Sequence, residues 1–149
     1  MNDLSLECYN KSLELNPEND LCYNDIGYLY QFKFNNEEKA LKFYSKAIEI
    51  NPLNATPLNN KGLLLKKKGL FLEAEKLYKM AIKINCYDIF CNNYISLLEI
   101  MNKTKAALYY LSKDVMKYSH KRCFSRYSEL LSKNGKFLEA EKWRRKSLE

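Results

Sequence analysis

The 149-residue sequence has little of what enzymes commonly use for catalysis. It contains one histidine, His120, one tryptophan and only four glycines. A single histidine excludes histidine metal clusters and the H-E-x-x-H motif, and the four glycines lie too far apart to form a phosphate-binding loop. No Ser–His–Asp set is evident either. We therefore expect this chain not to be an enzyme, with no catalytic residues, no metal site and no cofactor.

Cysteine pairs and long apolar runs are also missing. The five cysteines form no C-x-x-C pair, and their odd number is most simply explained by a reducing, intracellular compartment. No apolar run approaches the ~18 residues that a membrane span needs, and the N-terminus does not resemble a signal peptide. We expect a soluble protein of the cytoplasm, or of the nucleus, with no membrane partner.

The chain does contain a repeating pattern of about 34 residues. With only three prolines and four glycines among many helix-forming residues, the composition fits an all-α protein. The clearest copy of the pattern reads Tyr23-x2-Ile26-Gly27-x2-Tyr30, Ala40-x3-Tyr44 and Pro52. Weaker copies read Leu58-x2-Lys61-Gly62-x2-Leu65 with Ala74-x3-Tyr78, then Asn92-x2-Ile95-Ser96-x2-Glu99 with Ala106-x3-Tyr110, and Phe124-x2-Tyr127-Ser128-x2-Leu131 with Ala140-x3-Arg144.

A second internal match supports this register. The octapeptide G-L-F-L-E-A-E-K at 69–76 recurs as G-K-F-L-E-A-E-K at 135–142. The offset between them corresponds to one copy of standard length followed by one slightly shortened copy, the third repeat. Two independent signals therefore indicate the same repeat boundaries.

The pattern is similar to W-x2-L-G-x2-Y…A-x3-F…P of the tetratricopeptide repeat family, and the resemblance covers the whole chain. It implies an all-α fold, a right-handed superhelical solenoid of antiparallel helix pairs with about four and a half repeats and nine helices. In such a stack each repeat buries its apolar face against its neighbours. The expected domain spans 1–149, with a half repeat at 1–19 and repeats at 20–54, 55–88, 89–120 and 121–149.

The family resemblance also implies a function, since its members bind extended peptides in a concave groove lined by the first helix of each repeat. We therefore expect a protein–protein interaction scaffold. Spacings of three and four residues place each set of groove positions on one helical face. The candidate peptide-binding residues are Asn24, Asp25, Tyr28, Asn59, Asn60, Lys66, Phe90, Asn93, Tyr94, Leu97, Arg122 and Arg126.

Asparagines recur among these positions. In the predicted register Asn24, Asn59 and Asn93 are equivalent, and a row of amides can hold a peptide backbone whatever its side chains. The family's usual asparagine position lies one residue later, where only Asn60 matches. The alternative is that these are solvated side chains in an asparagine-rich chain.

The C-terminal half is the basic half. Net charge rises from −4 in the first fifty residues to +8 in residues 101–149, which would steer an acidic partner towards that end. Arg122 and Arg126, one turn apart, could hold a carboxylate or phosphate through charge-assisted hydrogen bonds. Two alternatives stay open: Glu129 could pair with either arginine, and the basic face could simply be solvated.

Phe90, Tyr94 and Leu97 form an apolar group in the third repeat. It could anchor one ligand side chain, or Phe90 and Leu97 could belong to the packing between helices. Two further functions are alternatives: RNA binding by the basic C-terminal half, and a role as the targeting arm of a larger enzyme. Solenoids usually end in polar capping helices, and none is visible here. We therefore expect one of two things: the chain is a segment of a longer array, or it self-associates through its uncapped ends.

Overall fold

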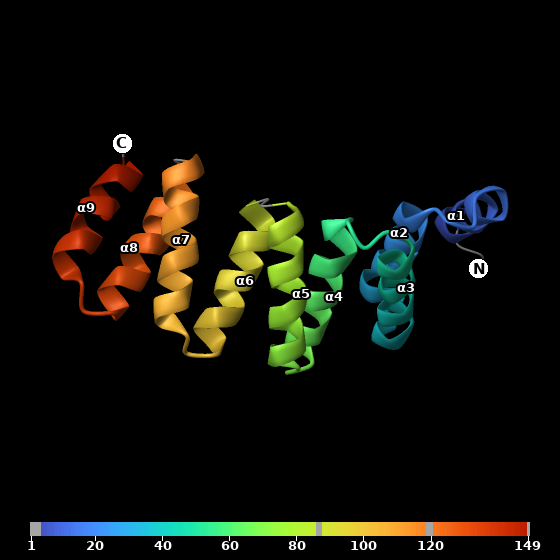
Figure 1. The fold of residues 1–149 in the computed structure, drawn as a ribbon, viewed down its shortest axis with the longest axis horizontal. Coiled ribbons are helices and arrows are strands. Elements are labelled where there is room, and N and C mark those ends of the chain that lie inside the picture. The colour runs from blue at the N-terminus through green and yellow to red at the C-terminus, as the bar shows by residue number, and fades with distance from the viewer. Residues whose placement is uncertain (1–3, 86–87, 119–120, 149) are drawn as a thin grey trace. The chain divides into compact units, whose positions relative to one another are not determined.

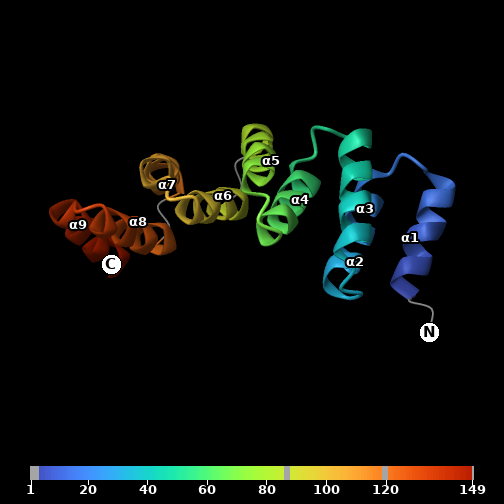
Figure 2. The ribbon, with the colours of Figure 1, turned by 90° about the horizontal axis from the view of Figure 1, so that it is seen from below.

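The computed structural model describes residues 4–85, 88–118 and 121–148, with side chains for 4–85, 89–112 and 124–148. In these ranges the chain forms nine α-helices and no strand (Figures 1 and 2). This confirms the predicted all-α class. The helices are α1 Leu4–Leu15, α2 Asp20–Phe32, α3 Glu37–Ile50, α4 Ala55–Lys67, α5 Phe71–Ile84, α6 Asp88–Ile100, α7 Thr104–Tyr118, α8 Lys121–Lys133 and α9 Phe137–Leu148.

The chain divides into two compact units, Met1–Cys86 and Tyr87–Glu149. The first contains α1 to α5 and the second α6 to α9. The expectation of one domain over 1–149 stays a prediction.

Asparagines start several of the helices. The side chains of Asn19, Asn36 and Asn54 each accept a hydrogen bond from a backbone N–H of the following first turn, at N···O distances of 3.2, 3.0 and 3.0 Å. A capping side chain satisfies one of the backbone donors that a helix N-terminus leaves unpaired. Part of the asparagine content therefore has a structural role at helix starts.

The turn inside each helix pair has one recurring backbone conformation. Asn35, Gly69, Asn102 and Gly135 have φ values of 49°, 78°, 55° and 75°, the left-handed region that glycine and asparagine tolerate best. In the last three turns, the N–H of the next residue donates to the carbonyl five positions earlier, at 3.0, 2.8 and 3.0 Å. This is a Schellman cap, and it ends each first helix at the same place in the repeat.

In the first unit, small residues of the first helix allow tyrosines of the second to approach closely. A Cβ on Gly27 would lie 2.8 Å from two ring atoms of Tyr44, and one on Gly62 would lie 3.1 Å from Tyr78. Both tyrosines have no exposed surface. A glycine of the first helix therefore faces a tyrosine of the second where α2 packs on α3 and where α4 packs on α5.

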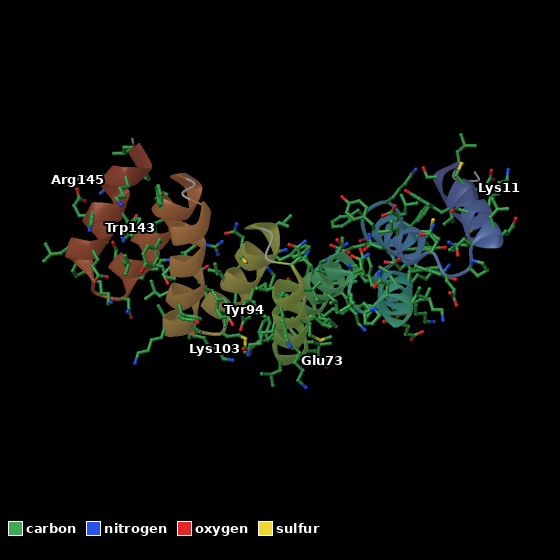
Figure 3. All side chains as sticks on the ribbon, turned by 45° about the horizontal axis from the view of Figure 1, so that its top comes forward. Lys11, Glu73, Tyr94, Lys103, Trp143 and Arg145 are labelled. Atoms are coloured by element: carbon green, nitrogen blue, oxygen red, sulfur yellow. The ribbon has the colours of Figure 1, made fainter. Side chains whose placement is uncertain are left out.

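In the second unit the core is mostly aliphatic. Leu97 and Leu98 of α6 and Leu111 of α7 are fully buried. Trp143 of α9 (labelled in Figure 3) lies 5.5 Å from the rings of Phe124 and Tyr127 of α8, measured between ring centroids. Sequence degeneracy in the third repeat therefore does not prevent close helix packing.

The predicted register of the third repeat was wrong by one residue. Ala107 has no exposed surface, whereas Ala106 is only half-buried. Ala107 also follows the left-handed Asn102 by five positions, the same spacing that separates Ala74 from Gly69. The buried pattern of α7 is therefore Ala107-x3-Leu111, and the two octapeptides are separated by two repeats of equal length.

The same correction applies to α6. First helices begin at residues 55, 88 and 121, so the family pattern in α6 is Cys91-x2-Tyr94-Ile95-x2-Leu98, and all four residues are buried. In this register Asn92, and not Asn93, is equivalent to Asn24 and Asn59. Asn93 instead occupies the position of Asn60, the family's usual asparagine position.

Candidate functional site

Four predicted site residues of the first unit form a chain of side-chain hydrogen bonds. Asn59 Nδ2 donates to Asn60 Oδ1 at 3.4 Å, and Asn60 Nδ2 donates to Asn24 Oδ1 at 3.0 Å. Asn24 Nδ2 in turn donates to Asp25 Oδ1 at 3.2 Å. Because Asn59 and Asn60 belong to α4 and the other two residues to α2, this polar row joins successive repeats.

The polar row ends at the half-buried Asp25 carboxylate. Asn24 and Asn59 are only 8% and 4% exposed, so much of their hydrogen-bonding capacity serves the protein itself. Asp25 also interacts with the hydroxyl of Tyr9 in α1, whose pKa is raised by desolvation and then by the negative charge of Asp25. The prediction that these amides hold a peptide backbone stays a prediction.

Beside the polar row, α2 carries a stripe of outward-facing residues. Leu21, Asp25, Tyr28 and Phe32 are spaced four, three and four positions apart, which places them on one helical face. Leu21 is 61% exposed, Tyr28 52% and Phe32 57%, and the rings of Tyr28 and Phe32 lie 4.5 Å apart. We call these four residues the α2 stripe. Sequence reasoning omitted Phe32, although its i+4 spacing from Tyr28 was a usable signal.

The neighbouring Gln31 has an internal role. Its Oε1 accepts a hydrogen bond of 2.7 Å from the hydroxyl of Tyr44, whose pKa is strongly raised, chiefly by desolvation. Lys66 occupies the equivalent position in α4 and is half-buried. These side chains border the surface formed by α2 and α4.

In the second unit, Arg126 binds protein groups. Its guanidinium donates to Asn92 Oδ1 at 3.1 Å and forms an ion pair with Glu99 at 2.8 Å. The bond to Asn92 is equivalent in position to the Asn60–Asn24 bond. The first joins α8 to α6 and the second joins α4 to α2, so each links the first helices of two successive repeats. The cation is thus partly neutralised by Glu99 of α6, and not by Glu129, which the sequence suggested.

The other predicted site residues of the second unit are mostly buried or lie outside the described side chains. Phe90, Tyr94 and Leu97 are 4%, 1% and 0% exposed, so they offer almost no surface. For Phe90 and Leu97 this agrees with the alternative of packing between helices; the burial of Tyr94 was not expected. Asn93 is half-buried on α6. Arg122 lies in α8, but its side chain is outside the described part of the structure.

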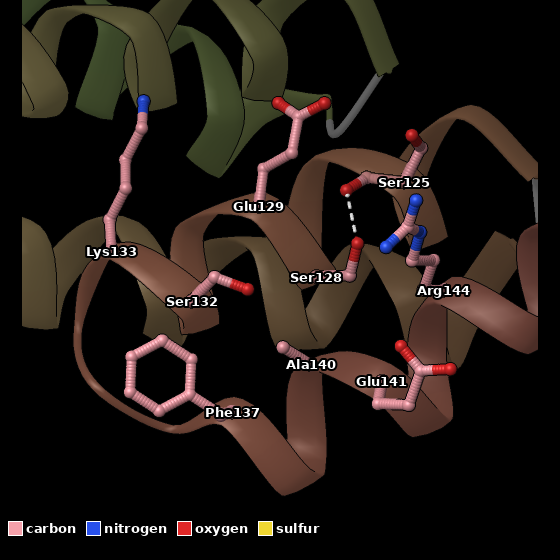
Figure 4. A pocket seen from close by; sticks show the side chains of 9 residues that line it. All are labelled: Ser125, Ser128, Glu129, Ser132, Lys133, Phe137, Ala140, Glu141 and Arg144. Atoms are coloured by element: carbon pink, nitrogen blue, oxygen red, sulfur yellow. Dashed lines mark hydrogen bonds between the residues drawn. The ribbon is translucent and has the colours of Figure 1, made fainter.

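An open cavity of about 820 Å³ lies between α8 and α9 (Figure 4). Three serines of α8 line one side, and Ser128 Oγ donates to the backbone carbonyl of Ser125 at 2.8 Å. The charged lining carries both signs, so the cavity favours neither anions nor cations. Its lining residues are Ser125, Ser128, Glu129, Ser132, Lys133, Phe137, Ala140, Glu141 and Arg144.

Among the described residues, no helix combines the length and the apolarity needed to span a bilayer. Within the same ranges, no three acidic, cysteine or histidine side chains gather in a way that could hold a metal ion.

Comparison with known families agrees with this geometry. Two models described as tetratricopeptide repeat match the chain, one at residues 22–52 and the other at 43–76. The chain is a tetratricopeptide repeat protein. The matched segments include most of α2, all of α3 and α4, and the start of α5.

Solved structures show the same tetratricopeptide fold. YrrB, described as a TPR protein with an unusual peptide-binding site, is 24% identical to this chain with a TM-score of 0.81. The match covers 95% of this chain and 74% of the YrrB chain. MamA is 17% identical, with a TM-score of 0.81 and coverage of 99% and 94%. Pseudomonas aeruginosa pilF is 21% identical, with a TM-score of 0.80 and coverage of 94% and 64%. No curated protein matches the chain.

Proposed function

We propose that this tetratricopeptide repeat protein is a protein-interaction scaffold that binds an extended segment of a partner protein on its first helices. The principal contact surface is the α2 stripe. The observation that carries the proposal is the exposed ring pair of Tyr28 and Phe32, 4.5 Å apart and each more than half exposed. The YrrB description, with its peptide-binding site, agrees with this proposal.

The two rings supply a substantial energy of association. A buried aromatic side chain removes about 150–250 Å² from water. Covering the exposed halves of Tyr28 and Phe32 would therefore contribute roughly 2 kcal/mol per ring at about 25 cal/mol per Å². Tyrosine is also common at the energetic centres of protein interfaces. The polar row beside the rings orders α2 against α4, so that the surface is largely preformed.

The scaffold role needs no chemistry from the chain itself, and we propose that it is not an enzyme. RNA binding gains no support from three of the basic side chains: Arg126 pairs with Glu99, Arg145 with Glu141, and the Lys146 ammonium lies 4.6 Å from the Trp143 ring centroid. An acidic partner for the C-terminal half, and self-association through the ends, stay predictions.

A pull-down from cell lysate tests the proposal. The wild type is compared with the double variant Tyr28→Ala, Phe32→Ala and with a matched control, Leu72→Ala, Met80→Ala. The control removes two apolar side chains of α5 that are 69% and 46% exposed. We expect proteins captured by the wild type and the control to be lost with the α2 variant. Equal capture by all three proteins would contradict the proposal.

A further inference from the structure

The charge around the α2 stripe indicates the chemistry of its ligand. Helices α1 and α2 together carry four acidic side chains and one basic side chain, Lys11. Asp20 already accepts hydrogen bonds from Asn54 and Asn51, at 2.7 and 3.3 Å. Asp25 is the acidic residue that lies within the stripe itself, between Leu21 and Tyr28.

The partners of Asp25 are neutral. Its carboxylate accepts a bond from the Asn24 amide and lies next to the Tyr9 hydroxyl. No cation lies within ion-pair distance of Asp25 among the residues that the structure describes. The charged form of a half-buried carboxylate that has only neutral partners is stabilised when a cation approaches it.

Several lysines elsewhere in the first unit have other partners. They lie on α3 to α5 or in the turn after α4. Each contacts a glutamate carboxylate or a tyrosine ring, and none of these contacts is with Asp25. The pairs are Lys46 with Glu49, Lys67 and Lys68 with Glu37, Lys79 with Glu75, and Lys39 over the Tyr30 ring.

From these contacts we propose that the α2 stripe binds a basic, apolar segment of a partner protein, a ligand class that rests on the proposed function. An arginine or lysine of the segment pairs with Asp25 and lies against the neighbouring Tyr28 ring, where a cation–π contact is available. Apolar side chains on either side cover Leu21 and Phe32. The stripe extends over eleven helical steps, about 16 Å, which an extended segment of about five residues spans.

The negative charge of Asp25 also favours this ligand over the alternatives. An acidic segment would place a carboxylate beside Asp25, where none of the described side chains brings a positive charge within ion-pair distance to offset the repulsion. RNA would place phosphates there, at the same disadvantage. The basic segment is the ligand that turns the uncompensated charge of Asp25 into a favourable contact.

Fluorescence anisotropy with synthetic peptides tests this inference. Three labelled heptapeptide pools share leucine and phenylalanine at alternate positions and carry arginine, glutamine or glutamate at the others. We expect the arginine pool to bind most tightly to the full chain. Asp25→Asn should weaken that binding about tenfold, the effect of losing one charge-assisted contact. Tyr28→Ala should weaken it while leaving the circular dichroism spectrum unchanged.

The matched control is Glu73→Gln, which removes one negative charge from an exposed position of α5 (Figure 3). It lowers the acidity of the unit as much as Asp25→Asn does but leaves the stripe intact. Equal weakening by the two variants, or tighter binding of the glutamate pool, would overturn the inference. If no pool binds but lysate capture still depends on Tyr28 and Phe32, the ligand chemistry is wrong and the scaffold proposal stands. If neither peptide binding nor lysate capture depends on the stripe, both the ligand chemistry and the scaffold proposal are wrong.

Discussion

Replacing Gly27 by alanine should destabilise the protein, although alanine is the better helix former. The propensity gain is about 1 kcal/mol. Against it, the new Cβ would lie 2.8 Å from the Tyr44 ring, and that ring is fully buried with its hydroxyl bonded to Gln31. Overpacking of this kind costs about 1–3 kcal/mol, and moving the ring adds the loss of a hydrogen bond, about 1 kcal/mol. We expect a net loss of about 1–3 kcal/mol in the free energy of unfolding.

Gly62→Ala is the internal control, because its Cβ would approach Tyr78 only to 3.1 Å. There a shift of a few tenths of an ångström suffices, and the propensity gain should leave stability almost unchanged. Urea denaturation followed by circular dichroism compares the variants. Adding Tyr44→Leu to Gly27→Ala should cost less than the two single effects combined, since the smaller side chain relieves the overlap. A Gly27→Ala protein as stable as Gly62→Ala would refute the reasoning.

Three further predictions concern single contacts. A double-mutant cycle on Arg126 and Glu99 should give a coupling of roughly 0.5–1 kcal/mol that shrinks in high salt, since both side chains are about one-third exposed; no coupling would contradict the ion pair. The pKa of Glu37 is lowered, chiefly by a hydrogen bond from Lys67, so this contact stabilises the fold above the ordinary glutamate pKa and is lost as pH falls through the lowered value. Lys67→Met should raise the Glu37 pKa in an NMR titration, and an unchanged value would count against the contact. Asn36→Ala should cost about 1 kcal/mol in urea denaturation and Asn36→Asp much less, because only the latter keeps the helix cap.

The helices could be predicted from the sequence because the repeat pattern is strong where packing is tight. The predicted register was wrong in the third repeat. Two neighbouring residues of equal size occur there, so the pattern of small residues fits equally well when the register is shifted by one position. Ala106 and Ala107 are indistinguishable by size, and only burial separates them. A usable signal was present in Asn102, which lies midway in sequence between the turn glycines Gly69 and Gly135. Turn residues with positive φ fix a register more sharply than small core residues do.

The candidate site was less predictable, because residue type does not reveal which polar groups are already paired. Asn24 and Asn59 are on the predicted surface but are largely buried in the polar row. Arg126 was a natural candidate for anion binding until the structure placed Glu99 beside it. Such pairings depend on contacts between the first helices of successive repeats, which are far apart in sequence. Periodicity places residues on a face, but it does not say how those residues bond to the next repeat.

Site-specific photocrosslinking tests the central claim most directly. A photoreactive phenylalanine analogue replaces Tyr28 on the α2 stripe in one protein and Leu72 on α5 in another; the replaced side chains are 52% and 69% exposed. Irradiation in lysate should yield discrete crosslinked partner proteins from position 28, and these products should disappear when Phe32→Ala is added. Position 72 should not yield them. The same products from both positions, or none from position 28, would contradict binding at the α2 stripe.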